Sequence, residues 1–342
     1  MNYFDIKAIS NSSLNYIDPK SGGSPRYFRK FLDGELEEKS SSSFEIGTLI
    51  HEELLEPGKI DIIAEATPGP KTQDIIQALF NRLYAEIPVE DIPVTELDTY
   101  SEETWQAVIP ADFYPKYNLQ TKINRIVKDG GEYWKCLCTS AGKLIVDPAT
   151  YHVVRGCIES IQLHTIANEL ISGMGFENYD ESQEEMEITF DLPWEIDDQT
   201  VTLPIKAKLD RVLISHEHKS ISLVDLKTTR SPIGTFEQTF TKYRYYRQLA
   251  FYCMCLKQAY PDYKIGEVFI VAVQTNKEYP ADVYKIDDTY LAAGEDEYIE
   301  LLNRCAFHLA RNNWGNSMET QLGMINSLVL QTNDYSSTDD QA

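Results

Sequence analysis

Two runs of alternating hydrophobic and polar residues lie within residues 201–229, on either side of a polar turn. In the first run, hydrophobic side chains at the odd positions alternate with mostly polar ones at the even positions, which end at Asp210. In the second run, Asp225 and Lys227 share a face with the hydrophobic positions 221 and 223. A period of two is typical of half-buried strands, so this stretch is predicted to form a β-hairpin.

The register of this hairpin would bring two acidic residues together. If residues 216–219 form the turn, Ser215 lies opposite Ser220, and the same register places Asp210 opposite Asp225. Directly opposed residues have Cβ atoms about 4.5–5.5 Å apart, and two carboxylates at that separation repel each other. A cation between them would remove the repulsion, and a divalent metal ion is the simplest one.

The periodicity of the remaining chain predicts helices and strands around the hairpin. A period of about 3.6 residues favours helices, and a continuous hydrophobic run is typical of a strand that is covered on both faces. The expected helices are 25–33, 44–57, 71–86, 117–129, 147–173, 236–256 and 288–312, and the expected further strands are 187–192, 267–275 and 281–286. This order predicts an α/β fold (an α+β mixed sheet), with a central mixed sheet flanked by helices.

The same pattern suggests how the chain is divided. We expect an N-terminal helical part at residues 1–60 and a helical insertion of unknown role at residues 61–142, where proline interrupts the pattern repeatedly. The core would follow at residues 143–315, and the polar tail at residues 316–342 is expected to be disordered at its end. The whole is expected to be one compact domain.

Charge is distributed unevenly along the chain. The net charge of −23 argues against a nucleic-acid partner, but residues 206–252 hold nine basic and four acidic residues and are locally positive. This zone could attract a polyanion to the paired acids, although ordinary scatter of surface charge also explains it. The candidates for nucleic-acid contact are Lys206, Lys208, Arg211, Arg230, Arg244 and Arg247.

Other sequence features limit the class of protein. No run of 18 or more hydrophobic residues and no signal peptide are visible, so we expect no membrane contact and a cytoplasmic location in a bacterium or a phage-infected cell. Six cysteines in a chain of 342 residues do not form a disulfide framework. Two C-x-C pairs, at 136–138 and 253–255, could form a four-thiolate site, but reduced and buried thiols are the simpler reading.

The paired acids and the neighbouring lysine suit phosphodiester hydrolysis. A metal ion held by Asp210 and Asp225 would polarise the phosphate and activate a water, and Lys227 would orient that water or neutralise charge in the transition state. Oxygen ligands favour Mg²⁺ or Mn²⁺ over zinc. A D-x-K triplet alone is common on polar strand faces. His51, on a predicted helix, is by itself more often structural than a ligand.

Four motifs resemble the successive core motifs of the PD-(D/E)XK nuclease superfamily, in the same order. They are GTLIHE at 47–52, KLDRV at 208–212, VDLKTT at 224–229 and YRQLAFY at 246–252. Their combination is similar to the RecE-type, lambda-exonuclease-like branch, which includes the nuclease domains of RecB and AddAB proteins. The resemblance implies a restriction-endonuclease-like core and a nuclease core at residues 143–315.

The resemblance also assigns roles to single residues. It implies that Asp210, Asp225 and the Leu226 carbonyl bind the metal, with His51 as an additional ligand, and that Lys227 is the catalytic lysine. Gln248 and Tyr252 would form the helical Q-x3-Y motif beside the site. A further glutamate from an earlier element is common in the superfamily, and Glu187 or Glu185 is the candidate here.

The activity that follows from the resemblance is a metal-dependent DNA exonuclease acting on duplex ends, in phage-type recombination or DNA processing. Members of the branch work beside a single-strand annealing recombinase, and some form homo-oligomers. Leu209 stands where the family name has proline, and the cysteine pattern of iron–sulfur RecB-like nucleases does not match. Two alternatives stay open: an endonuclease or single-strand or branched-DNA nuclease of the same fold, and a non-catalytic DNA-binding or assembly module.

Overall fold

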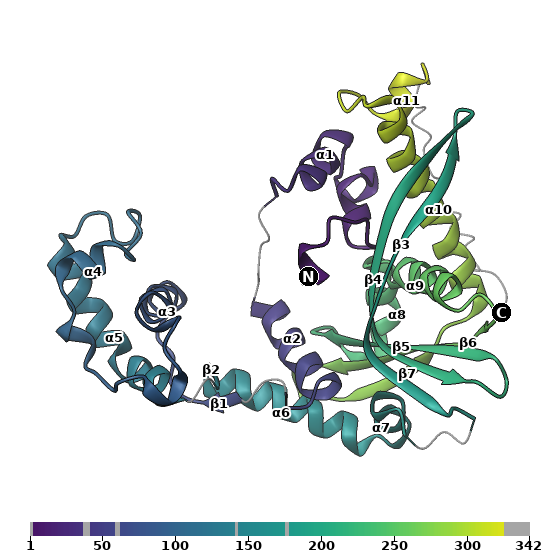
Figure 1. Ribbon diagram of the computed structural model, residues 1–342. Coiled ribbons are helices and arrows are strands. Elements are labelled where there is room, and N and C mark those ends of the chain that lie inside the picture. Colours follow the sequence, from purple (N-terminus) through teal and green to yellow (C-terminus); the bar gives the residue numbers. More distant parts are fainter. Residues whose placement is uncertain (1–2, 37–41, 59–61, 141–142, 175–177, 325–342) are drawn as a thin grey trace, which may run out of the picture.

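A five-stranded mixed sheet forms the centre of the molecule (Figure 1). The computed structural model describes residues 3–36, 42–58, 62–140, 143–174 and 178–324. The sheet has the order β3-β4-β5-β6-β7, with β5 and β6 parallel and every other pair antiparallel. Its strands are β3 (Glu181–Ile196), β4 (Gln199–Ser215), β5 (Ser220–Thr229), β6 (Lys264–Gln274) and β7 (Ala281–Lys285).

Helices cover both faces of this sheet. Hydrophobic side chains of α9 (Tyr245–Ala259) and α10 (Asp288–Arg311) pack with those of the sheet in one core. On the other face, α2 (Ser42–Leu55), α6 (Pro148–Leu163) and α7 (Thr165–Ser172) contribute to a second core. The predicted α/β class, a central mixed sheet flanked by helices, is therefore confirmed.

Two of the predicted long helices are interrupted, and each prediction was wrong at the break. The helix expected at 147–173 begins as predicted, with the Asp147 side chain accepting hydrogen bonds from the backbone N–H groups of Ala149 and Thr150. At His164 the backbone becomes extended, and the His164 ring accepts the Ala167 N–H at 3.2 Å to start α7. A hydrophobic period continues through a break of one residue, so the period alone could not reveal it.

The second interruption divides the helix expected at 236–256 into α8 (Phe236–Lys242) and α9, after η6 (Ile233–Thr235). Arg244, between them, has a φ of 55°, in the left-handed region that non-glycine residues rarely adopt. Only residues from Tyr245 onwards belong to α9. The break therefore changes which side chains share a helix face.

The N-terminal segment packs beside the end of β4 where that strand no longer pairs with β5. It consists of η1 (Tyr3–Asp5), η2 (Ser13–Tyr16), η3 (Pro19–Ser21) and α1 (Pro25–Asp33). The Ile9 N–H donates to the Pro204 carbonyl at 2.7 Å, and the Lys206 N–H donates to the Ile9 carbonyl at 2.8 Å. The helix α1 has the predicted range of 25–33, with Ser24 as its N-terminal cap and Gly34 in the left-handed conformation at its end.

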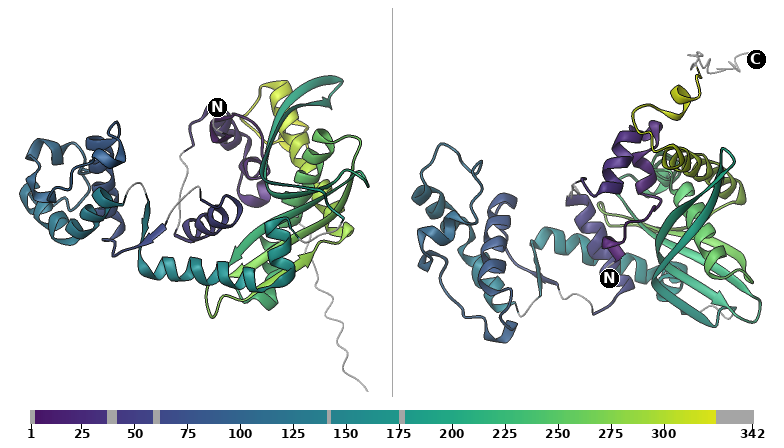
Figure 2. Two further views of the ribbon diagram at one scale, coloured as in Figure 1. Left: turned by 60° about the horizontal axis from the view of Figure 1, so that its bottom comes forward. Right: turned by 45° about the horizontal axis from the view of Figure 1, so that its top comes forward.

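The chain between the second and sixth helices forms a separate lobe (Figures 1 and 2). Its side chains build a hydrophobic core of their own around Trp105 and Trp134, and two short parallel strands join it to the rest of the molecule. Its elements are β1 (Ile62–Ala64), α3 (Pro70–Tyr84), η4 (Val89–Asp91), η5 (Leu97–Thr99), α4 (Glu102–Gln106), α5 (Leu119–Thr139) and β2 (Leu144–Val146).

The C-terminal elements complete the described chain. The last long helix matches its predicted range of 288–312 within one residue, and α11 (Met318–Gln321) follows it. The expected end of the tail, from residue 325 on, lies outside the described residues. Several strands and helices are longer than predicted, most of all β3, which extends on both sides of residues 187–192.

Candidate active site

The hairpin formed by β4 and β5 has the predicted register and opens at its acidic end. Ser215 pairs with Ser220, and the ladder continues as far as Arg211 and Val224. Asp210 and Asp225 would form the next pair, at the point where the ladder ends. Beyond that point the N-terminal segment, instead of β5, bonds to β4. The separation of the two strands leaves room beside the acids.

Asp210 is held from both sides of this opening. Its Oδ2 accepts the Leu226 N–H at 2.7 Å and lies 3.6 Å from Nδ1 of His51. Burial raises the pKa of the Asp210 carboxyl, although the ammonium of Lys227 and the Leu226 hydrogen bond act in the opposite direction. The hydrogen bond fixes the direction of one carboxylate oxygen and leaves the other available to a ligand.

Asp225 is almost fully enclosed, with 1% of its side chain exposed. Its Oδ2 lies 2.5 Å from Nζ of Lys227, but among the described residues neither of its oxygens has a hydrogen-bond partner of acceptable geometry. Burial raises the pKa of Asp225 to about 6, with Asp210 adding to the effect. Burial disfavours the Lys227 ammonium, but Asp225 and Asp210 outweigh it and raise the pKa of Lys227. At pH 7 the Asp225 carboxylate is therefore ionised and the Lys227 amine protonated.

His51 reaches the acids from the opposite layer of the fold. It lies on α2, which is anchored by the buried side chains of Leu49 and Ile50. Burial, followed by the charge of Lys227, lowers the pKa of His51 to about 4. The imidazole is therefore neutral at pH 7, and a neutral imidazole is the form that binds a metal ion.

Glu185 joins His51 and Asp210 in one group of three potential metal ligands, whereas Glu187 lies outside it. His51, Glu185 and Asp210 each offer a ligand atom within 4.8 Å of the other two. Glu184 pairs with Arg211 and Met186 with Leu209, so Glu185 lies opposite Asp210. Its φ of 48° is left-handed, a conformation that costs roughly 1–2 kcal/mol for a residue with a side chain.

Glu187, by contrast, is exposed and lies opposite Lys208. The two glutamates have the same parity in β3, so alternation alone could not separate them. The turn between β3 and β4 could have done so. Asp197 and Asp198 both have positive φ, as in the two-residue turns that fix hairpin register, and Ile196 pairs with Gln199.

Lys208 neutralises part of the acidic group. Its Nζ forms an ion pair with Glu185 and lies 4.0 Å from Oε2 of Glu56, on α2. Among the six basic residues predicted to contact nucleic acid, Lys208 forms an ion pair with a member of the group of His51, Glu185 and Asp210. Arg230 is exposed beyond the end of β5.

The other predicted nucleic-acid contacts are engaged inside the protein. Lys206 is buried and donates to the Tyr3 carbonyl at 3.0 Å. Arg211 is buried, and its Nη1 lies 3.0 Å from Oε2 of Glu184. Arg247 is 2% exposed and donates to the side-chain oxygens of Asn11 and Asn15. Arg244 is engaged in the same way, by Asp18. These four basic residues could reach a phosphate only if their contacts were broken.

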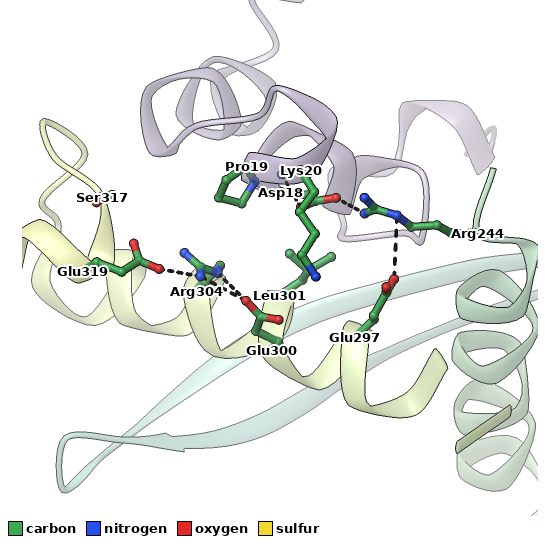
Figure 3. Close-up of a pocket in the computed structure, with 10 residues that line it drawn as sticks. All are labelled: Asp18, Pro19, Lys20, Arg244, Glu297, Glu300, Leu301, Arg304, Ser317 and Glu319. Atoms are coloured by element: carbon green, nitrogen blue, oxygen red, sulfur yellow. Dashed lines mark hydrogen bonds and ion pairs between the residues drawn. The ribbon is translucent and has the colours of Figure 1, made fainter. Parts of the chain in front are cut away.

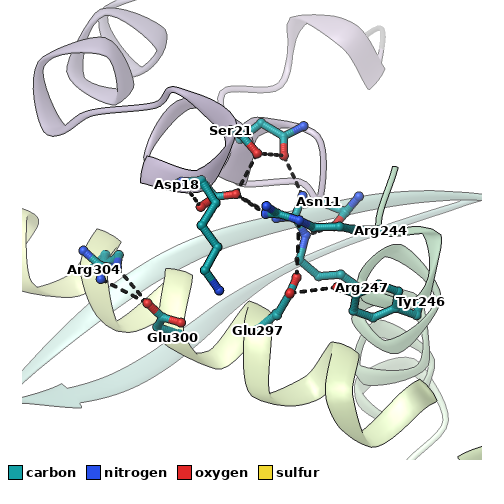
Figure 4. Close-up of polar contacts among 11 residues, drawn as sticks. Asn11, Asp18, Ser21, Arg244, Tyr246, Arg247, Glu297, Glu300 and Arg304 are labelled. Atoms are coloured by element: carbon teal, nitrogen blue, oxygen red, sulfur yellow. Dashed lines mark hydrogen bonds and ion pairs between the residues drawn. The ribbon is translucent and has the colours of Figure 1, made fainter. Parts of the chain in front are cut away.

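Arg244 does not lie on α9 with Gln248 and Tyr252, although the predicted helix 236–256 contained all three. Because it precedes the first turn of α9 in a left-handed conformation, its side chain turns to the buried Asp18 and lies 4.0 Å from Glu297 (Figures 3 and 4). Burial alone would raise the pKa of Asp18, but hydrogen bonds from Ser21, Lys20 and Arg244 lower it. Arg244 thus ties α9 to the N-terminal segment.

Gln248 and Tyr252 do lie on one face, beside the site. The Gln248 amide donates to the Tyr252 hydroxyl at 2.8 Å. Burial, with the charges of Asp225 and Asp210, raises the pKa of Tyr252 well above its usual value, so the hydroxyl keeps its proton. Both side chains line a cleft of about 810 Å³ between the N-terminal segment, β4 and α9. Lys208, which forms an ion pair with Glu185, lines the same cleft.

Two sequence expectations concern the rest of the molecule. All six cysteines are free, and five of them are buried, as expected for reduced thiols rather than a four-thiolate site. Within the described part of the chain, no helix combines the length and the hydrophobicity that a membrane span requires.

Comparisons with known proteins give one family match and two similar structures. The family model described as the PD-(D/E)XK nuclease superfamily matches residues 158–319. No curated protein sequence matches the chain. Two crystal structures are similar at 12% identity. A protein from Eubacterium rectale described as a putative exonuclease covers 97% of this chain and 94% of its own, with a TM-score of 0.45. The structure of SSO0001 covers 78% of this chain and 88% of its own, with a TM-score of 0.24.

The matched region contains β3 to β7, and with them the acids and the lysine of the site. His51 lies upstream of it, on α2. Residues 158–319 of the chain are therefore similar to the PD-(D/E)XK nuclease superfamily.

Proposed function

We propose that the protein is a metal-dependent DNA exonuclease that hydrolyses phosphodiester bonds from the ends of duplex DNA. The observation that carries the proposal is the gathering of His51, Glu185 and Asp210, whose potential ligand atoms all lie within 4.8 Å of one another. The enclosed Asp225, in an ion pair with Lys227, interacts electrostatically with Asp210 and His51. Clustered carboxylates repel each other, and a divalent cation held among them removes the repulsion. The superfamily match of residues 158–319 supports the reaction class.

The donor set fits a divalent cation. His51, Glu185 and Asp210 would hold it, with Asp225 and the Leu226 carbonyl as further predicted ligands. Three carboxylates and one imidazole suit Mn²⁺ or Mg²⁺, which prefer oxygen ligands. When bound, such an ion stabilises negative charge on the reacting phosphate and makes a nearby water acidic enough to react at neutral pH.

Lys227 supplies the positive charge of the protein itself. Its ammonium lies 2.5 Å from Oδ2 of Asp225 and remains protonated. In this position it can donate a hydrogen bond to a phosphate oxygen or to the attacking water, and thereby stabilise the charge that develops as the bond breaks. Tyr252, whose hydroxyl is held by Gln248, can donate to the same region.

Nuclease assays on linear and circular DNA test this proposal. Purified protein with Mn²⁺ is expected to digest linear duplex DNA and to leave closed circular DNA intact. Asp225→Asn and Lys227→Ala are expected to reduce the rate by at least about 100-fold. Glu187→Gln, on the same strand but outside the acidic group, is the matched control and should digest as the wild type does. Cleavage of the circle would indicate an endonuclease, and undiminished digestion by Asp225→Asn would overturn the proposal.

The RecE-type assignment extends the proposal to polarity and partners. It rests on the four sequence motifs, and it implies resection of the 5′-terminated strand beside a single-strand annealing recombinase in phage-type recombination. Duplexes labelled at one 5′ end or one 3′ end test the polarity, since 5′ resection releases only the 5′ label at early times. Sedimentation of the purified protein, with and without DNA, tests whether it forms a homo-oligomer.

A further inference from the structure

Tyr243, between α8 and α9, and Tyr245, the first residue of α9, form a stacked pair at the cleft. The ring centroids of Tyr243 and Tyr245 are 5.9 Å apart and their planes differ by 24°. Both rings line the same cleft as Gln248 and Tyr252, and Tyr243 is 58% exposed. The exposed ring offers a flat hydrophobic face on which a planar ligand can stack.

The backbone between the two rings is fixed rather than loose. Arg244, between them, holds the left-handed conformation, and its guanidinium is bound to the buried carboxylate of Asp18 (Figure 4). Asp18 is itself fixed by the Ser21 hydroxyl at 2.6 Å and the Lys20 N–H at 2.9 Å. The chain therefore accepts an unfavourable backbone conformation at the residue that presents the two rings.

The pair belongs to a row of rings and ammonium groups that runs from the surface to the carboxylates. The exposed Lys242 lies 5.2 Å from the ring of Tyr243. At the inner end, Nζ of Lys227 lies 5.1 Å from the ring of Tyr245 and 2.5 Å from Asp225. Rings that receive bases and ammonium groups that receive phosphates are the two components of single-strand binding sites.

The size and charge of the cleft select one strand of nucleic acid. Its volume of about 810 Å³ is within the range of roughly 300–1,000 Å³ that holds small ligands, so it admits a few nucleotides rather than a double helix. Its lining includes the basic side chains of Lys7 and Lys208 and the acidic side chain of Asp5, in a protein with a net charge of −23. Lys206 and Arg247 also line it, but their charged groups are engaged inside the protein.

We propose that Tyr243 and Tyr245 are a stacking platform for the bases of a single DNA strand that enters the cleft, with its phosphates passing from Lys242 towards the carboxylates. The proposal rests on the proposed nuclease function and specifies the form of its substrate as an unpaired strand or a frayed end. The two rings are substrate-positioning groups and take no part in bond cleavage.

Binding of a fluorescent oligonucleotide tests the platform without hydrolysis. A short single strand carrying 2-aminopurine is titrated with protein in EDTA, where stacking on a ring quenches the base. Tyr243→Ala is expected to lose the quenching and to raise the Kd by about 5- to 100-fold. Tyr243→Phe keeps the ring and should restore both. Tyr117→Ala, at an exposed tyrosine on the distant lobe, is the matched control.

Turnover separates this proposal from the nuclease proposal. On a duplex with a single-stranded tail and Mn²⁺, Tyr243→Ala is expected to raise KM with little change in kcat. If the wild type digests DNA and Tyr243→Ala equals it in Kd, quenching and KM, the platform is overturned and the nuclease stands. If the wild type hydrolyses no DNA but quenches 2-aminopurine through Tyr243, the nuclease proposal fails and the platform stands.

Discussion

The enclosed carboxylate of Asp225 makes metal binding measurable through stability. A ligand that binds only the folded state stabilises it, by about 2.7 kcal/mol at a concentration one hundred times its Kd. Mn²⁺ is therefore expected to raise the Tm of the wild type. Glu185→Gln should abolish most of this shift because it removes a carboxylate of the gathered group. Asp225→Asn should do the same because it removes the predicted ligand that interacts with Asp210.

The control for this measurement lies two residues along the same strand. Glu187→Gln removes an exposed carboxylate with the same parity as Glu185 and should keep the full Mn²⁺ shift. Scanning fluorimetry over a Mn²⁺ titration provides the readout. An equal loss of the shift in both glutamine variants would refute the assignment of Glu185.

Two histidines give the fold a defined pH dependence. The pKa of His51 is lowered to about 4 and that of His308 is also lowered, in both cases mainly by burial. As the pH falls below about 6.5, the unfolded chain binds protons that the folded chain does not accept. Stability is therefore fully present above that pH and decreases towards the folded-state pKa values.

Urea unfolding between pH 8 and pH 5.5 measures this slope. His308 is 1% exposed, and its Nδ1 bonds to the Asn313 carbonyl at 2.7 Å. His308→Asn keeps a donor for that carbonyl but cannot titrate, so its stability should depend less steeply on pH than that of the wild type. If the variant and the wild type lose stability equally with falling pH, His308 has the same pKa in the folded and unfolded states.

At the residue scale, the sequence predicted where the acids meet but not every member of the group. Period-two alternation and a four-residue turn were sufficient to place Asp210 and Asp225 in register, because parity and turn length are local properties. Glu185 depends on a positive φ that no side-chain pattern encodes. The ion pairs of Arg211 and Arg244 depend on residues distant in the sequence, so their burial was not predictable from local charge.

Helix α2 approaches the sheet closely, and this controls the position of His51. A Cβ atom built at Gly47 would lie 3.1 Å from Oγ1 of Thr228 on β5. Gly47→Ala is expected to be tolerated, because the threonine hydroxyl can rotate and alanine favours a helix by about 0.5–1 kcal/mol. Gly47→Leu should push α2 away from β5 and weaken Mn²⁺ binding while the protein remains folded.

Calorimetric titration with Mn²⁺ measures this effect, and circular dichroism reports the fold. The matched control is Gly131→Leu on α5, where an added Cβ meets no atom within 4 Å. It should leave the Kd for Mn²⁺ unchanged. A normal Kd in Gly47→Leu would mean that α2 can move without moving its histidine.

At the element scale, predictions held where an element ends with a strong local signal. The serine cap, the proline and the terminal glycine of α1 defined its limits, and the uninterrupted hydrophobic run defined β6. The breaks at His164 and Arg244 carry neither glycine nor proline. Tertiary contacts impose them, for example the contact between Arg244 and Asp18.

The whole molecule contains hydrophobic cores that should unfold separately. The lobe is built around its own core, whereas the two cores beside the large sheet share β4, β5 and β6. Calorimetry of the full chain is therefore expected to show two transitions, because separate cores do not unfold as one cooperative unit. Mn²⁺ should raise the temperature of only the transition that belongs to the sheet.

A pair of core substitutions assigns the transitions. Ile126→Ala in the lobe and Leu249→Ala in α9 each truncate a fully buried side chain, which typically costs about 2–5 kcal/mol. The first should lower only the transition that Mn²⁺ leaves unchanged, and the second only the other one. A single transition lowered by both variants would show that the lobe and the sheet unfold together.

The separate lobe also contains a cysteine that allows selective labelling. Of the six cysteines, Cys136 on α5 is the one that is partly exposed, and the other five are buried. A thiol-reactive dye should therefore label the native protein at the lobe first. Burial raises the pKa of the Cys136 thiol, so labelling should speed up at mildly alkaline pH. A single fluorophore attached there would report the motion of the lobe while the protein processes DNA, without any engineered cysteine.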